Sequence, residues 1–125
     1  MTPDFVIADS MIWIDHLSRS DDTLAWLIRR RRIRIHPMII GEIALGSIAR
    51  RDIIIRELQE LPAVGVALHD EVMAMIEWLE LWSRGIGFVD VHLLASTRQL
   101  AGCALWTRDK RLHAQAERLG VAYAP

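Results

Sequence analysis

The sequence predicts an α/β domain in which helices cover both faces of a parallel sheet. Short apolar segments alternate with longer helical patterns along the chain, and this alternation is typical of parallel sheets. The 125 residues are 52% hydrophobic, which is enough to bury one core. The chain contains no internal repeat, low-complexity tract or linker, so we expect a single domain over residues 1–125.

The first strand is expected at residues 4–8, an apolar segment that is partly β-branched and too short for a helix. A helical pattern follows at 10–17. The polar stretch SRSDD then interrupts the chain and offers Asp21 or Asp22 as the cap of a helix at 23–31. These segments form the first strand and the helical connection after it.

A second short strand is expected at 33–35. Pro37 then begins a helix that runs to about residue 49, because proline is favoured in the first turn of a helix. A further helix at 52–61 ends before a proline, and the segment 63–66 is a candidate third strand.

The longest helix is expected at 70–84, where Gly85 and Gly87 stop it. The remaining elements follow from the same signals of apolar periodicity and glycine breaks. They are a helix at 89–100, a strand at 104–106, a helix at 109–119 and a last strand at 120–123.

The charge distribution is uneven, although the formal net charge is only −1. Fourteen of the fifteen basic residues are arginine, and Arg29, Arg30, Arg31 and Arg32 form a run that Arg34 follows. The run is either a solvated helix end, where cations are favourable, or a contact for phosphate or an acidic partner. The small net charge excludes a protein that coats DNA through bulk charge.

The sequence does not predict a membrane or secreted protein. No apolar run approaches the roughly 18 to 20 residues of a membrane-spanning helix, and the N-terminus lacks a secretory signal. The single Cys103 cannot form an internal disulfide and lies in an apolar stretch, LAGCALW. We therefore expect a buried thiol, a reducing cytoplasmic location and no membrane partner.

Four acidic residues stand in unusual surroundings. Asp9 lies in the apolar FVIADSMIWI, Glu42 is the only charged residue of PMIIGEIALGSIA, and Asp90 is the only carboxylate of GIGFVDVHLLAST. The fourth, Asp109 in LWTRDKRL, has basic neighbours. Asp9 and Asp109 follow expected strands, at the edge where ligands bind in parallel sheets. We therefore expect all four acids to converge at that edge.

Each acid also has a purely structural interpretation. Asp9 and Asp109 could cap the helices that follow them, and Asp90 could cap a helix beginning at Val91. Glu42 could reach water past a small neighbour, either of the two glycines beside it. Caps are common, so each interpretation is reasonable for one acid taken singly, but it does not account for the gathering of all four.

Carboxylates gathered in one cleft repel each other unless a cation sits among them. Magnesium accepts such oxygen ligands, and manganese accepts similar donors. Zinc is disfavoured because no His or Cys pair has ligand spacing, and we expect His92 to be a surface or partly buried side chain. The chemistry that fits is metal-assisted hydrolysis of a phosphodiester, since Cys103 is expected to be buried and no serine lies in a nucleophile-elbow pattern.

Four fragments in this order resemble the PIN-domain ribonucleases, and most of all the VapC-type toxins of toxin–antitoxin pairs. They are DSMIWID (9–15), GEIALG (41–46), GFVDVHLLA (87–95) and LWTRDKRL (105–112). The resemblance covers nearly the whole chain. It implies a three-layer α/β/α sandwich with a parallel sheet of about five strands, and a magnesium- or manganese-dependent endoribonuclease.

The resemblance also implies roles for individual residues. The acidic quartet of the family falls on Asp9, Glu42, Asp90 and Asp109. Asp9 and Asp90 would bind the metal directly, Asp109 directly or through water, and Glu42 would help to hold water or a second ion. The hydroxyl residues Ser10 and Thr107 match positions that support the acids.

The resemblance further implies an RNA substrate, a cognate antitoxin, and a homodimer or a larger toxin–antitoxin assembly. An apolar stripe that includes Trp78 and Trp82 could face such a partner, or it could belong to a core helix that is covered on both sides. The arginine run and Arg108 are candidates for contact with the RNA backbone. The alternative function is a non-catalytic module on the same fold, whose acidic pocket docks a basic partner segment.

Overall fold

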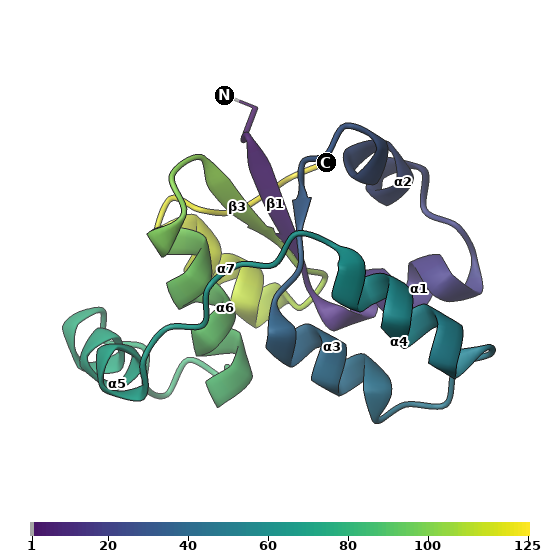
Figure 1. Cartoon of the computed structure of the whole chain (residues 1–125). Helices are drawn as coiled ribbons and strands as arrows, with labels where there is room; N and C mark the ends of the chain where they lie inside the picture. The colour runs from purple at the N-terminus through teal and green to yellow at the C-terminus, as the bar shows by residue number, and fades with distance from the viewer. Residues whose placement is uncertain (1) are drawn as a thin grey trace.

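A computed structural model describes residues 2–125, which form seven helices and three strands (Figure 1). In chain order they are β1 (Phe5–Ala8), α1 (Ser10–Ser18), α2 (Asp22–Arg29), β2 (Ile33–Arg34), α3 (Pro37–Ala44), α4 (Arg51–Glu60), α5 (His69–Trp78), α6 (Phe88–Gln99), β3 (Cys103–Trp106) and α7 (Lys110–Arg118). None of these helices is long and apolar enough to cross a membrane.

The sheet is parallel, and its strand order is β2-β1-β3. Val6 of the central strand pairs with Ile33 on one side and with Ala104 on the other. Because β1 lies in the middle, Val6, Ile7 and Ala8 are all at most 1% exposed. The α/β class with a parallel sheet is confirmed.

The strands expected at 63–66 and 120–123 are each reduced to one parallel bridge, Ile35–Ala63 and Leu105–Ala122. The first segment does not continue the ladder, and the carbonyl of Gly65 accepts a hydrogen bond of 2.7 Å from Ser96 Oγ of α6. The sheet of the described residues therefore has three strands, where about five were expected.

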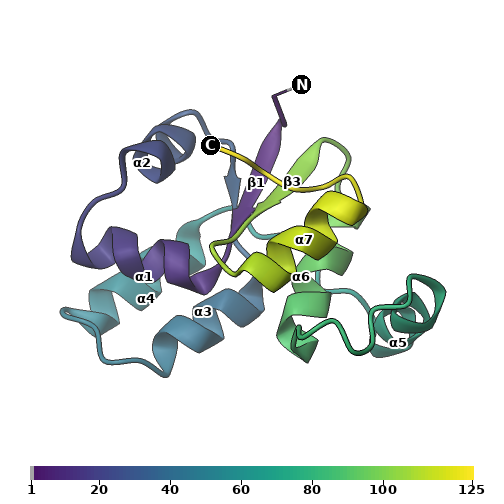
Figure 2. The ribbon, with the colours of Figure 1, turned by 180° about the vertical axis from the view of Figure 1, so that it is seen from behind.

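Helices cover both faces of this sheet. Helices α6 and α7 both contact β3. Helix α6 is nearer the viewer in Figure 1, and α7 is nearer in the view from behind in Figure 2. Between these layers lies the core, whose largest fully buried side chains are mostly leucine and isoleucine: Ile7, Ile12, Leu24, Leu27, Ile33, Ile35, Ile39, Ile43, Leu93, Leu94, Leu105 and Leu112.

Two helices are shorter than the sequence predicts. Helix α3 ends at Ala44 instead of near residue 49, and α5 ends at Trp78 instead of residue 84. The longest helix is α6 rather than α5. Glu80 and Ser83 have positive φ values of 51° and 58°, which an α-helix does not accommodate. Apolar periodicity continues past the true end of α5 because Leu81 is buried in the turn that follows.

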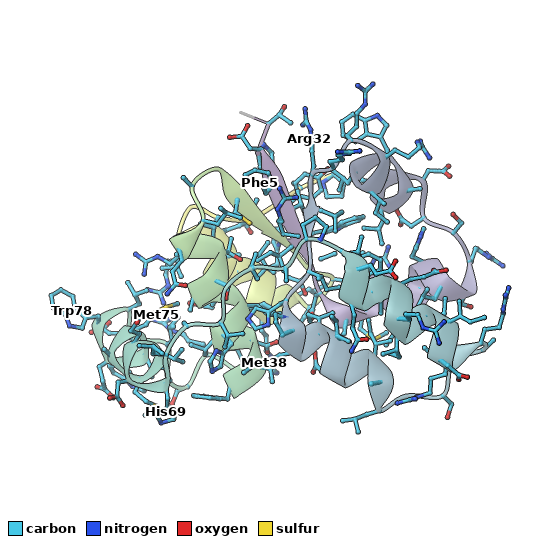
Figure 3. The ribbon with its side chains drawn as sticks, in the orientation of Figure 1. Phe5, Arg32, Met38, His69, Met75 and Trp78 are labelled. Carbon is cyan, nitrogen blue, oxygen red and sulfur yellow. The ribbon has the colours of Figure 1, made fainter. Side chains whose placement is uncertain are left out.

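The tryptophans of the apolar stripe lie on the surface. Trp78 is 86% exposed and Trp82 is 53% exposed, and Figure 3 shows Trp78 projecting from the end of α5. Only part of the stripe, including Met75, packs against the core. The interpretation of this helix as covered on all sides is therefore wrong, and its outer face is free to meet a partner.

Candidate active site

Asp9 occupies the edge of the sheet at which β1 ends. Its backbone N–H donates to the carbonyl of Trp106 at 2.8 Å, which fixes the residue beside the end of β3. The side chain is only 9% exposed. Its Oδ1 caps α1 by accepting from the Ser10 N–H at 2.7 Å, and its Oδ2 accepts from Thr107 Oγ1 at 2.8 Å. The structural interpretation of Asp9 as a cap is therefore correct, but the second oxygen has a further role.

Thr107 joins two of the candidate acids. Its hydroxyl donates to Asp9 and accepts from the backbone N–H of Asp109 at 3.1 Å. Asp109 in turn caps α7, because its Oδ1 accepts from the N–H groups of Arg111 and Leu112 at 2.9 and 3.2 Å. Thr107 is 6% exposed, whereas Asp109 is exposed to solvent. The ends of β1 and β3 thus bring Asp9 and Asp109 to the same edge.

Asp90 lies inside α6 and not before it. The helix begins at Phe88, so the expectation that Asp90 caps a helix beginning at Val91 is wrong. Its Oδ2 instead reaches back to the N–H of Gly87 at 2.9 Å. Gly87 is the residue that precedes the helix, and Asp90 is the third residue within it. From that position an acidic side chain can reach back to the N–H of the residue before the helix. The carboxylate is therefore held at the N-terminal end of α6, where the helix dipole favours negative charge.

Glu42 lies on α3, and although the residue as a whole is in contact with solvent, its electrostatic neighbours are the other candidate acids. Partial desolvation of its carboxylate raises the pKa of Glu42, and the carboxylates of Asp9 and Asp90 raise it further. A hydrogen bond with the Ser10 side chain acts in the opposite direction. Ser10 is thus next to Glu42 through its side chain and next to Asp9 through its backbone.

Asp90 also has a raised pKa, for which burial is the largest cause. The N–H of Gly87 opposes this effect, while the carboxylates of Asp9 and Asp109 add to it. Each of the four acids is therefore close enough to at least one other for their charges to interact. Burial accounts for the larger part of the cost of ionising Glu42 and Asp90, and nearby negative charge adds to it.

The four carboxylates do not form a complete set of metal ligands in this structure. Within residues 2–125, no group of three His, Cys, Asp or Glu side chains is arranged to hold a metal ion. The donor chemistry nevertheless suits a hard divalent cation, since all four groups are carboxylates. A cation among them would also offset the repulsion that raises the pKa of Glu42 and Asp90.

Arg108 is engaged close to this edge. Its guanidinium group forms ion pairs with Asp15 of α1 and, at 3.2 Å, with Asp21 before α2. It therefore ties the loop after β3 to the helices after β1. As a contact for the RNA backbone, Arg108 would first have to leave two carboxylates.

A buried histidine pair near the acids was not expected from the sequence. His36 is fully buried and caps α3, since its Nδ1 accepts from the Met38 N–H at 3.0 Å. His92 of α6 is 4% exposed, so the expectation of a surface or partly buried side chain is wrong. The two ring centroids are 6.3 Å apart. The position of His36 directly before a helix-initiating proline was the signal that could have identified it as a cap.

This pair packs the start of α3 against α6, the two helices that carry Glu42 and Asp90. Burial, together with His92, lowers the pKa of His36 to about 4. Burial also lowers the pKa of His92, with a smaller contribution from His69. Both rings are consequently neutral near pH 7, and they add no positive charge beside the acids.

Comparison with known proteins adds an independent finding. No family model matches the chain. Ribonuclease VapC32 of Mycobacterium tuberculosis, from either of two strains, is 42% identical over 119 residues, which are 95% of this chain and 96% of the relative. The crystal structure of PAE2754 from Pyrobaculum aerophilum matches with a TM-score of 0.67 at 18% identity. The matched part is 95% of this chain and 87% of the PAE2754 chain. The second likeness shows the fold alone.

Proposed function

The chain belongs to the VapC family of PIN-domain ribonucleases, and we propose from this premise that it is a metal-dependent endoribonuclease whose site is formed by Asp9, Glu42, Asp90 and Asp109. As a VapC protein it would act as the toxin of a toxin–antitoxin pair, held in check by a cognate antitoxin. We also infer that its fold is the three-layer PIN sandwich, in which the two single bridges mark the outer strands.

The observation that carries this proposal is the mutual influence of four acids from distant segments. Glu42 responds to the charges of Asp9 and Asp90, and Asp90 responds to those of Asp9 and Asp109. A fold does not gain stability by placing like charges together. Their gathering at the ligand-binding edge of a parallel sheet therefore supports a site that takes up a cation.

Asp9, Asp90 and Asp109 would hold the cation, which we propose to be Mg²⁺ with Mn²⁺ as a substitute. Such an ion, when bound, polarises a phosphate group and lowers the pKa of nearby water. The chain's own residues supply orientation. Thr107 and the Ser10 N–H hold both oxygens of Asp9, and the Gly87 N–H holds Asp90 at the end of its helix.

The reaction we propose is hydrolysis of a phosphodiester bond in RNA. Water forms a new bond to phosphorus and gives up a proton, the bond to one ribose oxygen breaks, and that oxygen takes a proton from solvent, so that the protons balance. Glu42 is suited to accept the proton of the attacking water, because its raised pKa makes it a stronger base than an ordinary glutamate. Ser10 would keep Glu42 in place through the hydrogen bond between their side chains.

A homodimer or a larger toxin–antitoxin assembly would use apolar surface of the kind that α5 exposes. Trp78 and Trp82 supply large exposed side chains, and tryptophan is enriched at the centres of protein interfaces. The groove between α5 and α6, lined in part by Met75, Leu79 and Arg98, has a volume of about 450 Å³. These features support a protein partner on this face.

The test is RNA cleavage by the purified protein with Mg²⁺, with Mn²⁺ and with a chelator. Asp9→Asn and Asp90→Asn should abolish cleavage, and asparagine retains the capping oxygen at position 9. Asp70→Asn, at an exposed acid on α5, is the matched control. Equal cleavage in metal and in chelator would contradict the proposal. An acid-dependent binding of a basic segment without cleavage would favour the non-catalytic alternative.

A further inference from the structure

The arginine run lies at the edge of the sheet where the strands begin, whereas the acids lie at the edge where the strands end. Arg34 places its guanidinium carbon 4.2 Å from the ring centroid of Phe5, the first residue of β1, whereas Asp9 follows the last. Arg32 is also at the beginning of β1, since its carbonyl accepts from the Val6 N–H at 2.8 Å. Figure 3 shows Arg32 and Phe5 at the same end of the molecule. Four residues of strand separate the two edges by about 13 Å.

We use the term arginine edge for the five arginines within residues 29–34, namely Arg29, Arg30, Arg31, Arg32 and Arg34. In the part of the chain that the structure describes, none of them forms an ion pair with an acidic side chain. Five positive charges therefore stand together, without neutralisation, on a chain whose net charge is −1. Such a concentration attracts an anionic partner.

Aromatic rings hold some of these arginines in place. The guanidinium groups of Arg30 and Arg32 lie 5.5 and 5.3 Å from the ring centroid of Trp26. Arg34, over Phe5, also donates to the carbonyls of Arg31 and Ile33 at 3.1 and 3.0 Å. A side chain that is already positioned loses less entropy when it binds, and a guanidinium group matches the two oxygens of a phosphate.

An apolar pocket adjoins the arginine edge. It has a volume of about 410 Å³ and is lined by Ile28, Arg31, Ile33, Arg34, Leu61 and Pro62. Its two arginines contribute charge, and its other walls are aliphatic. The phosphate of a nucleotide can meet the arginines while its unstacked base packs on the aliphatic walls, whereas the carboxylate side chains of an acidic peptide would meet the arginines alone.

We propose that the arginine edge binds the sugar–phosphate backbone of the RNA substrate at a point remote from the bond that is cut. The preferred substrate is then an RNA that contacts both edges of the sheet, either because it is long enough or because it is folded to reach both. This inference rests on the proposed function, because it assumes that RNA is cut at the acids. It assigns the arginine edge to positioning of the substrate and not to chemistry.

The first experiment compares two substrates. A dinucleotide contains one bond to cut but is too short to occupy both edges, whereas a long RNA contacts both. For Arg30→Gln/Arg32→Gln, the ratio of kcat/KM for the long RNA to kcat/KM for the dinucleotide should fall about tenfold. Arg50→Gln/Arg56→Gln removes two exposed arginines elsewhere and is the matched control. An equal ratio in both double variants would overturn the proposal.

The second experiment measures binding without cleavage, by fluorescence anisotropy of a labelled single-stranded RNA with the Asp9→Asn protein in chelator. The same protein is then measured with Arg30→Gln/Arg32→Gln added. Loss of two phosphate contacts should reduce the slope of log K against log salt concentration by about 1.4. Polyglutamate is the competing probe. If it binds as tightly as the RNA and depends on the same two arginines, the partner is an acidic polypeptide and the proposal is wrong.

These experiments separate two kinds of failure. A wild-type protein that cuts no RNA with Mg²⁺ or Mn²⁺ contradicts the proposed function, whatever the salt slope. A wild-type protein that cuts RNA at the acids, with an unchanged ratio and an unchanged slope in Arg30→Gln/Arg32→Gln, contradicts the role of the arginine edge alone.

Discussion

Thr107 Oγ1 donates a hydrogen bond of 2.8 Å to Asp9 Oδ2, although the two residues are 98 positions apart in the chain. The same hydroxyl accepts from the Asp109 N–H. One side chain therefore sets the separation of two acids that follow different strands. Both Asp9 and Thr107 are buried, so the geometry of this contact does not depend on solvent.

Thr107→Val should reduce both stability and cleavage. Valine has a similar shape but cannot donate to Asp9, and the carboxylate oxygen is left buried without a partner. Such a loss costs about 1 to 3 kcal/mol of unfolding free energy, and loss of a residue that orients a metal ligand lowers activity about 10- to 100-fold. Urea unfolding and RNA cleavage measure the two effects.

Thr107→Ser is the matched variant, because serine keeps the hydroxyl. It should restore most of the cleavage that Thr107→Val loses. If serine and valine have the same low activity, the methyl group and not the hydrogen bond to Asp9 accounts for the effect, and the assigned role of Thr107 is wrong.

The metal-free protein should lose stability as the pH rises through the range in which Glu42 and Asp90 ionise. Their ordinary pKa values are 4.5 and 3.8, and both are raised in the folded protein, first by burial and then by neighbouring carboxylates. Between the ordinary and the raised value, the folded state binds more protons than the unfolded state. The stabilisation is complete at lower pH and is lost as the pH rises through the folded pKa.

Urea unfolding of the wild type and of Glu42→Gln, in chelator at pH values from 3 upward in steps of about one unit, isolates the contribution of Glu42. The difference in unfolding free energy between the two proteins should shift in favour of the variant as the pH rises. Glu57→Gln, which removes one exposed carboxylate on α4, is the matched control. Parallel curves for Glu42→Gln and the wild type would show that the acids do not interact.

Addition of Mg²⁺ should raise the melting temperature, since an ion that binds the folded state alone stabilises it by about 2.7 kcal/mol at a hundred times its dissociation constant. Asp90→Asn should reduce this effect, and a chelator should abolish it in the wild type. Thermal unfolding over a titration of Mg²⁺ and of Mn²⁺ is the measurement. A melting temperature that neither ion changes would contradict the assignment of Asp9, Asp90 and Asp109 as ligands.

The edge at which the acids lie could be predicted from the sequence because two of them directly follow apolar strands. How Asp90 is held could not. A helix was expected from residue 89, but the small and apolar residues GIGF do not show whether Asp90 caps the helix or lies in its first turn, and α6 begins at Phe88. The carboxylate of Asp90 therefore reaches back to Gly87 from inside the helix.

The other errors have a common physical origin, which is that tertiary contacts override local pattern. The carbonyl of Gly65, in the segment expected as the third strand, accepts from Ser96 of α6, and this segment keeps only one bridge to the sheet. Leu81 is buried by a turn with two left-handed residues, and its burial imitates a longer helix. His92 is buried against His36 and Phe88 from sequence positions that show no pairing pattern.

His36 should make the protein lose stability as the pH falls below 6.5. Burial and His92 lower its pKa from 6.5 to about 4, so between these values the unfolded state binds a proton that the folded state does not. A shift of this size corresponds to about 3 kcal/mol of unfolding free energy, present above pH 6.5 and lost as the pH falls towards 4. This dependence is opposite in sign to that of Glu42 and Asp90.

His36→Asn separates this effect from the helix cap, because asparagine keeps a side-chain oxygen that accepts from the Met38 N–H but does not titrate. The variant should be less stable than the wild type at pH 7, since the lost ring leaves a cavity. Its unfolding free energy should nevertheless change less between pH 7 and pH 4, as measured by urea unfolding. A His36→Asn curve parallel to that of the wild type would show that another group governs the loss of stability in acid.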